Sequence, residues 1–182
     1  MTNELSGYDQ ALSKWIKAVP DFPISGILFR DITPLLSTPS AFARSIDRFA
    51  ELCEQLKVEC IVGAESRGFI FGAPLAQQLN LPFVPVRKPG KLPRATESVS
   101  YSLEYGEDTL EIHKDDLSQG QRVVFIDDLL ATGGTAAASV SLIEKLGAQV
   151  VSCLFLIELV GLGGRARLAS YPCTSLIHYQ ED

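Results

Sequence analysis

The chain has 182 residues, of which 46% are hydrophobic and 21% charged, and its formal net charge is −6. This length and composition predict one globular domain over residues 1–182, and the negative charge argues against a general nucleic-acid binder. No apolar run approaches the roughly 20 residues that span a bilayer, and the first residues do not resemble a signal peptide, so we expect a cytoplasmic protein that binds no membrane.

In the first half of the chain, segments with helical periodicity alternate with short apolar runs. Residues 22–34 contain prolines and a glycine, and we expect them to be irregular. Apolar residues then recur at three- and four-residue steps over 42–56, which predicts an amphipathic helix. Short apolar runs predict buried strands at 60–63 and 83–86, and the residues between them favour a helix at 68–79.

The second half continues this alternation after one interruption. Residues 101–112 alternate between polar and apolar, which predicts a hairpin with its turn at Gly106–Asp108. An almost wholly apolar strand is predicted at 122–126, followed by an alanine-rich helix at 135–146. Two further strands are predicted at 150–159 and 174–179.

Strands that alternate with helices are typical of an α/β fold with an open, mostly parallel sheet flanked by helices. Two pieces add to this sheet: a small N-terminal hood at about residues 20–35 and a flexible hairpin lid at about residues 87–113. Additions of this kind commonly cover the carboxyl ends of the strands, where ligands bind in open α/β sheets.

The most informative stretch is 123–135 (VVFIDDLLATGGT), where an apolar strand runs into two acids, a short loop and two glycines at the start of a helix. Glycines let the backbone approach a ligand closely, and the first N–H groups of a helix, together with its dipole, form a phosphate site. Thr132 and Thr135 add hydroxyl donors. Asp127 and Asp128 would accept hydrogen bonds from the hydroxyls of a ribose whose 5′-phosphate rests in the loop.

A cluster of basic residues lies near the middle of this acidic chain. Arg87, Lys88, Lys91 and Arg94 fall within eight residues, and no acid lies between Arg87 and Glu97. From composition alone, this stretch is either a solvated basic loop or a loop that binds an anion.

Cysteines and histidines give little sign of a metal site. The four cysteines are scattered, and the two histidines lie far apart. We therefore expect buried free thiols in a reducing cytosol. No cluster of side chains is sufficient to form a metal cage.

The stretch 123–135 closely resembles the phosphoribosyl pyrophosphate signature of the type I phosphoribosyltransferases. Further segments resemble the adenine-specific branch of that family, namely FPISGILFRD (22–31), VGAESRGFIFG (62–72), VRKPGKLP (86–93) and YSLEYG (101–106), which continues into LEIH (110–113). The resemblance runs from about Phe22 to about Leu168. It implies an enzyme that joins adenine to phosphoribosyl pyrophosphate and releases AMP and pyrophosphate.

The resemblance also implies a role for individual residues. Those that would hold the phosphoribosyl group are Asp127 and Asp128 for the ribose hydroxyls, and Ala131, Thr132, Gly133, Gly134 and Thr135 for the 5′-phosphate. Those on the pyrophosphate side would be Ser66, Arg67, Arg87, Lys88 and Lys91. The adenine pocket would be formed by Leu28, Phe29, Arg30 and Leu159, with the two leucines on the faces of the base.

Three further expectations come from the chemistry and the resemblance together. Glu104 is the candidate acid/base for the proton of the incoming purine. Mg²⁺ would arrive bound to substrate oxygens, because it retains waters and favours phosphates. In similar enzymes the arginine matching Arg87 reaches the site of the neighbouring subunit, which implies a homodimer.

Three other functions are compatible with parts of this pattern. A related phosphoribosyltransferase could use hypoxanthine, guanine or orotate, but segment 22–31 favours adenine. A purine-sensing regulator with this fold would need a basic DNA-binding segment, whereas the residues before Phe22 include only two lysines. An interaction protein with a decayed site would not be expected to retain the acids, glycines and threonines of 123–135.

Overall fold

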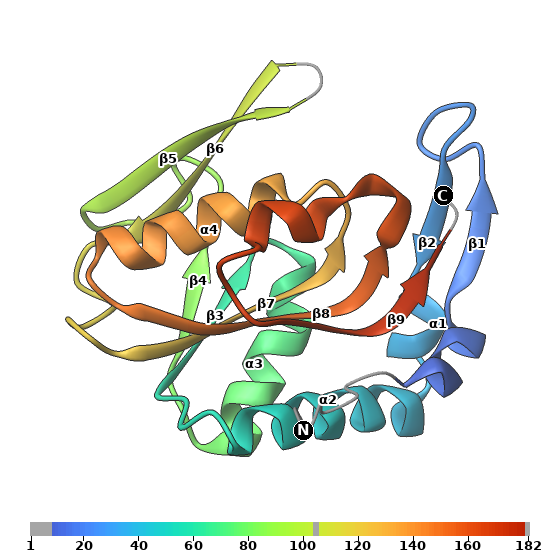
Figure 1. Ribbon diagram of the computed structural model, residues 1–182, viewed down its shortest axis with the longest axis horizontal. Coiled ribbons are helices and arrows are strands. Elements are labelled where there is room, and N and C mark those ends of the chain that lie inside the picture. The colour runs from blue at the N-terminus through green and yellow to red at the C-terminus, as the bar shows by residue number, and fades with distance from the viewer. Residues whose placement is uncertain (1–8, 104–105, 181–182) are drawn as a thin grey trace.

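The fold is built around one parallel sheet, as the alternation of strands and helices predicts. We describe it from a computed structural model, which covers residues 9–103 and 106–180. Five strands pair in the order β4-β3-β7-β8-β9 (Figure 1), and every neighbouring pair is parallel. Their bounds are β3 Cys60–Ala64, β4 Phe83–Val86, β7 Arg122–Leu130, β8 Gln149–Leu159 and β9 Cys173–Tyr179.

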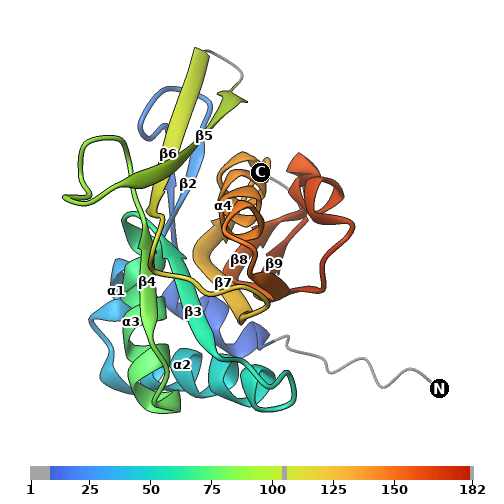
Figure 2. The same ribbon diagram turned by 90° about the vertical axis from the view of Figure 1, so that its left-hand side faces the viewer.

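Helices cover both faces of this sheet. The helices α2 (Pro39–Glu54) and α3 (Arg67–Leu79) lie on one side, and α4 (Gly134–Lys145) lies on the other (Figure 2). Short helical segments complete the fold: η1 Gln10–Trp15, α1 Thr33–Leu36, η2 Val160–Leu162 and η3 Gly164–Leu168. Among the described residues, no helix has both the length and the apolar character needed to cross a membrane.

The period of two along each strand divides the core into two layers. On β3, Ile61 joins the cluster that includes α2 and α3, whereas Cys60 and Val62 join the cluster that includes α4. Because both faces are buried, the strands have near-continuous apolar sequences. This burial holds the carboxyl ends of β3 and β7 side by side, which positions the loops that follow them.

The N-terminal segment is more regular than the sequence indicates. Within 22–34, Leu28–Asp31 forms strand β2, which pairs antiparallel with β1 (Lys17–Pro20), and Thr33–Leu36 forms α1. The expectation of an irregular segment was therefore wrong for these residues. The partner strand lies about ten residues earlier, where the sequence carries no clear alternation, so a reading of 22–34 alone misses the pairing.

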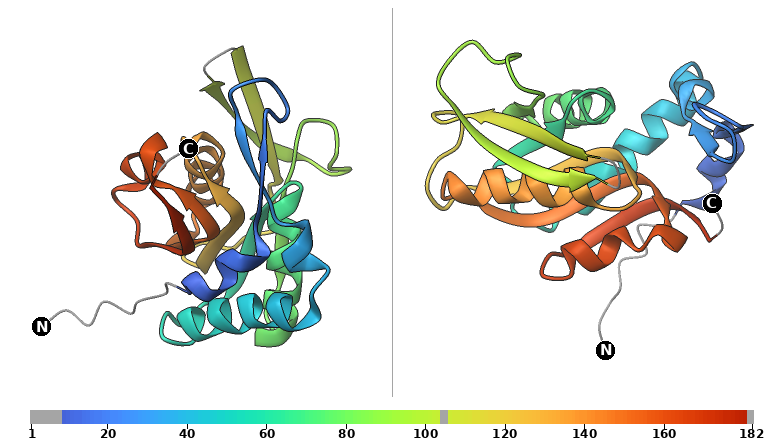
Figure 3. Two further views of the ribbon diagram at one scale, coloured as in Figure 1. Left: turned by 90° about the vertical axis from the view of Figure 1, so that its right-hand side faces the viewer. Right: turned by 90° about the horizontal axis from the view of Figure 1, so that it is seen from above.

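The predicted hairpin is present, but its turn is not at Gly106–Asp108. Strand β5 (Thr96–Leu103) pairs with β6 (Gly106–His113), and Leu103 is the register partner of Gly106. The predicted turn residues lie inside β6, because the register of the whole eight-residue pairing outweighs the local turn preference of Gly-Glu-Asp. The two small sheets, β1–β2 and β5–β6, lie at opposite ends of the central sheet (Figures 1 and 3).

Candidate functional site

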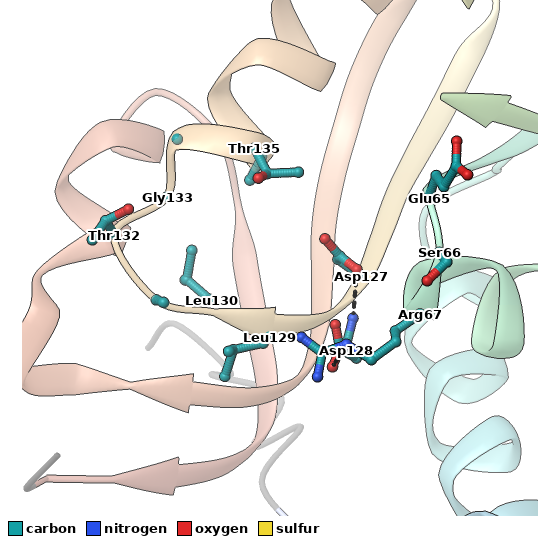
Figure 4. A pocket seen from close by; sticks show the side chains of 13 residues that line it. Glu65, Ser66, Arg67, Asp127, Asp128, Leu129, Leu130, Thr132, Gly133 and Thr135 are labelled. Atoms are coloured by element: carbon teal, nitrogen blue, oxygen red, sulfur yellow. Dashed lines mark hydrogen bonds and ion pairs between the residues drawn. The ribbon is translucent and has the colours of Figure 1, made fainter. Parts of the chain in front are cut away.

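A pocket of about 230 Å³ opens where β3 and β7 end and α4 begins. Figure 4 shows that the loop after β3 and the loop after β7 face each other across it. The lining residues are Glu65, Ser66, Arg67 and the continuous stretch 127–136. The structure thus brings the two predicted phosphate loops together in one pocket, at the edge of the sheet where open α/β folds bind ligands.

The loop after β7 has the form expected of a phosphate loop. Strand β7 continues through both aspartates to Leu130, four residues beyond the predicted strand end. Gly133 then has φ +79°, in the left-handed region that favours glycine, and α4 begins at Gly134. The free N–H groups of the first turn of α4 therefore lie at the pocket, and Thr135 belongs to that turn.

The two aspartates are electrostatically coupled. Asp128 is 4% exposed, and its backbone N–H donates to Asp127 Oδ1 at 2.9 Å. Burial, and then the Asp128 carboxylate, raise the pKa of Asp127 well above its usual value. Burial also raises the pKa of Asp128, although the Arg67 guanidinium opposes this effect. A pair of this kind would accept a proton or a hydroxyl donor readily, because either one relieves the repulsion between the carboxylates.

Arg67 links three parts of the site. The Glu65–Ser66 peptide bond before it is cis, and Arg67 is the first residue of α3. Its Nε lies 3.0 Å from Asp128 Oδ2, and its guanidinium lies 5.6 Å from the centre of the Phe29 ring on β2. Figure 4 shows Arg67 beside the acid pair, and its contact with Phe29 adds the N-terminal hairpin to the β3 loop and the acids at this side chain.

The basic stretch begins at the rim of the pocket. Arg87 donates to both oxygens of Glu65, at 3.0 Å from Nε and 3.0 Å from Nη2, and Arg87 Nη1 donates to the Lys91 carbonyl. The backbone N–H of Lys88 also donates to Glu65. The hydrogen bonds from Arg87 are the main reason that the pKa of Glu65 is lowered. This role of Glu65 was not predicted from the sequence, although a charged residue so close to the end of a buried strand was a signal.

The residues predicted for the base lie on β2 and β8. Phe29 faces Arg67 as described, and the Arg30 guanidinium stacks on the Tyr179 ring at 3.8 Å. Leu28 is the register partner of Pro20, and Leu159 that of Tyr179. Both leucines are half-buried. The structure thus places Phe29 beside α3 and Arg30 beside β9, while the stacking of a base between the two leucines stays a prediction.

Tyr101 connects the β5–β6 hairpin to the phosphate loop, a link that the sequence analysis did not anticipate. Its hydroxyl donates to Asp108 at 3.1 Å and lies 3.1 Å from Thr135 Oγ1, and Lys88 Nζ pairs with the same aspartate. Burial alone would raise the pKa of Asp108, but the hydrogen bond from Lys88 and those from its other neighbours outweigh it and lower the pKa. A β-carbon on Gly134 would lie 3.1 Å from the Tyr101 ring, so glycine lets the hairpin approach α4 closely.

The predicted acid/base Glu104 lies outside the described residues. Its role therefore stays a prediction, as do the ligand roles of the other residues. In the described part of the chain, no group of three or more His, Cys, Asp or Glu side chains is arranged to hold a metal ion.

Comparisons with known proteins match most of the chain. A family model described as the phosphoribosyl transferase domain matches residues 33–173. An adenine phosphoribosyltransferase of a Synechococcus species is 57% identical over 168 residues, which cover 92% of this chain and 98% of that relative.

Solved structures of similar proteins share the whole fold. The adenine phosphoribosyltransferase of Thermoanaerobacter pseudethanolicus is 54% identical and superposes with a TM-score of 0.90 over 93% of this chain and 98% of that one. The enzyme of Saccharomyces cerevisiae was solved with adenine and an imino-altritol bisphosphate. It is 42% identical and superposes with a TM-score of 0.87 over 91% of this chain and 96% of that one.

Proposed function

The chain belongs to the adenine phosphoribosyltransferases, within the phosphoribosyl transferase family, and from this membership we infer its reaction. It transfers the 5-phosphoribosyl group from phosphoribosyl pyrophosphate to adenine, giving AMP and pyrophosphate in purine salvage. The structural observation that carries this inference is that the acid pair, the N-terminus of α4 and the Arg67 loop meet in one pocket.

We propose that the phosphoribosyl group binds along the end of β7 and the start of α4. The 5′-phosphate would accept hydrogen bonds from the loop 131–135, where the positive end of the helix dipole stabilises an anion. Asp127 and Asp128 would accept hydrogen bonds from the ribose hydroxyls. The raised pKa values of this pair support the assignment, because hydroxyl donors offset the cost of holding two carboxylates together.

The leaving pyrophosphate would face the Arg67 loop. Glycosyl transfer develops positive charge on the sugar, while negative charge accumulates on the departing group. Ser66 and Arg67 line the pocket, and Arg67 can form two parallel hydrogen bonds to an anion. Arg87, Lys88 and Lys91 supply further positive charge from the rim, where Arg87 already pairs with Glu65.

Adenine would lie between the hood and the end of β8. Leu28 and Leu159 would pack against its faces, Phe29 would border it beside Arg67, and backbone groups near Arg30 would bind its Watson–Crick edge. In this placement the attacking ring nitrogen would lie beside the anomeric carbon of the ribose. Glu104 would accept or share the proton that the purine must release.

The donor set at the pocket suits Mg²⁺ that is shared with substrate. Three carboxylates line the pocket, but Asp128 already pairs with Arg67 and Glu65 with Arg87, so the side chains alone are too few for the six oxygens that Mg²⁺ prefers. We therefore propose that the ion is bound mainly by oxygens of phosphoribosyl pyrophosphate and waters, next to Asp127 and Asp128. When bound, it would neutralise charge on the leaving group.

We also propose a homodimer in which Arg87 serves the neighbouring subunit's site. Within one chain, Arg87 pairs with Glu65 at the rim of its own pocket, which supports a role on the pyrophosphate side. Service to a neighbouring subunit's site would require this pair to open. A cytoplasmic location is proposed with it. The four cysteines are all unpaired, and three are buried, which suits a reducing compartment.

Base selectivity tests the proposed function. The protein is incubated with phosphoribosyl pyrophosphate and Mg²⁺, then offered adenine, hypoxanthine, guanine or orotate separately, and pyrophosphate release is measured. Only adenine should give rapid turnover, because a site that hydrogen-bonds an amino group leaves buried groups unpaired when an oxo group replaces it. Equal or faster turnover of another base would identify a different member of the family, and no turnover of any base would favour a ligand-binding regulator.

A further inference from the structure

Glu158, near the end of β8, is a buried carboxylate that the proposed mechanism does not use. It is only 4% exposed. Arg165 donates to both of its oxygens, with Nε at 2.9 Å from Oε1 and Nη2 on Oε2. The Ser175 hydroxyl donates to Oε2 at 2.9 Å, and His178 Nε2 lies 3.6 Å from the same oxygen. These partners lower the pKa of Glu158 although burial acts to raise it, so the carboxylate is ionised and paired at neutral pH.

Arg165 ties one loop to two strands through these contacts. The residue belongs to η3, which follows β8, and its Nη1 also donates to the Cys173 carbonyl of β9 at 2.7 Å. The guanidinium therefore makes three directed contacts with the sheet. A planar fork held in this way fixes the position of the backbone that carries it.

The residue before Arg165 lies directly against the phosphate loop. A β-carbon added to Gly164 would lie 2.1 Å from the Ala131 carbonyl oxygen and 2.9 Å from the Gly133 nitrogen. In the other direction, a β-carbon on Gly133 would lie 2.6 Å from the Gly164 oxygen. The two backbones touch with no side chain between them, so a shift of η3 moves or releases the loop 131–133.

We propose that Glu158 and Arg165 form a clamp that positions the 5′-phosphate loop through the backbone of Gly164. All three are positioning residues, since they act through the loop. The proposal rests on the proposed function, which assigns the loop 131–135 to the 5′-phosphate. It predicts that disturbing the clamp weakens binding of phosphorylated ligands and leaves recognition of free adenine largely intact.

Gly164→Ala tests the contact itself without changing any charge. Calorimetry with ribose 5-phosphate and with AMP should show Kd values at least tenfold above those of the parent, because the new methyl group pushes against the Ala131 carbonyl. The KM for adenine at saturating phosphoribosyl pyrophosphate should change less than threefold. Gly120→Ala is the control for a general loss of stability: Gly120 has φ +74° but no atom within 4 Å of an added β-carbon, so this variant should lose stability without loss of ligand affinity.

Variants of the ion pair test the other end of the clamp. Arg165→Ala should raise both Kd values about tenfold, and Arg165→Lys should recover less than half of that loss because lysine lacks the fork. The double variant Glu158→Gln/Arg165→Met removes both charges and so leaves no buried carboxylate unpaired. Its affinity for ribose 5-phosphate should nevertheless be lower than that of the parent. Arg44→Ala is the control, since Arg44 makes a similar two-bond pair with the buried Asp9, and its Kd values should match the parent's.

The outcomes separate this proposal from the proposed function. Ribose 5-phosphate affinity within twofold of the parent in Gly164→Ala and in the double variant would overturn the clamp, as would an equal rise in the KM for adenine. A parent protein that binds neither ribose 5-phosphate nor AMP would instead contradict the proposed function, and the clamp would fail with it. Binding measurements require no turnover, so the two failures are distinguishable.

Discussion

The stretch from β7 into α4 lines the pocket, and the β5–β6 hairpin contacts this stretch through Tyr101, but the two are held in different ways. The first is the middle of the buried sheet, where Val123–Ile126 have no exposed surface and the residues proposed to bind the phosphoribosyl group follow one another along the chain. The second is a two-stranded ribbon whose contact with the site depends on pairs such as Tyr101 with Thr135, 34 residues apart. A rigid segment suits binding, whereas a ribbon of this kind suits a cover over the reacting groups.

The largest effect is expected on the hairpin side, where chemistry is proposed. Glu104→Gln should lower kcat by about 10² to 10⁴, the usual loss for one proton-transfer group. Thermal stability and the Kd of phosphoribosyl pyrophosphate should hardly change. The assay is single-turnover kinetics, which isolates the chemical step. A kcat within about threefold of the parent would mean that solvent, and not Glu104, accepts the proton. The hairpin would then have no part in the chemical step.

A smaller effect is expected on the central segment, and it should appear in binding. Asp128→Asn should raise the Kd of AMP and of phosphoribosyl pyrophosphate by about tenfold to a hundredfold, because a hydrogen bond to a charged group contributes about 1.5–3 kcal/mol. Thr135→Val should raise these Kd values about fivefold, which is the usual effect of losing one neutral hydrogen bond. Calorimetry checks both variants. Unchanged AMP affinity in both would remove the phosphoribose assignment.

Subunit mixing examines the rim between the two regions. Arg87→Ala and Asp127→Asn should each be nearly inactive alone. If Arg87 acts across a subunit boundary, a mixed dimer contains one site free of both changes, so activity should return when the variants exchange subunits. Native mass spectrometry confirms the exchange. Exchange without recovery would place Arg87 in its own subunit's site or outside the site.

The smallest expected effect concerns stability. Because the pKa of Asp127 is raised, the folded state holds this proton more tightly than the unfolded state. The stabilisation is present below the usual value of 3.8 and is lost as pH rises through the raised pKa. Asp127→Asn, whose side-chain oxygen can still accept the Asp128 N–H, should therefore gain stability relative to the parent as pH rises.

Urea unfolding at several pH values measures this gain in the free energy of unfolding. In thermal unfolding, each kcal/mol should appear as a rise of about 2–4 °C in Tm. Glu59→Gln is a suitable control, because Glu59 accepts a backbone N–H from Arg122 at the opposite end of β7. If the difference in stability between Asp127→Asn and the parent did not depend on pH, folding would not raise the pKa of Asp127.

The sequence by itself determined the parallel α/β fold, the apolar strand that runs into two acids and the glycine-rich start of α4, although β7 extends four residues beyond its predicted end. These features depend on neighbouring residues: burial on both faces selects apolar strands, and a helix start with glycines leaves N–H groups free. Hence the predicted and observed bounds agree within one residue for α4, β8 and β9.

Only the tertiary structure decided which distant residues meet. The pairing of β1 with β2, the true register of the hairpin, the bond between Arg87 and Glu65 and the approach of Gly164 to Ala131 all join residues separated along the chain. Local preference carries no information about such contacts, and at Gly106–Asp108 it favoured the wrong turn. They are set by the packing of the whole sheet, which brings the ends of its strands to one edge and thereby forms the pocket.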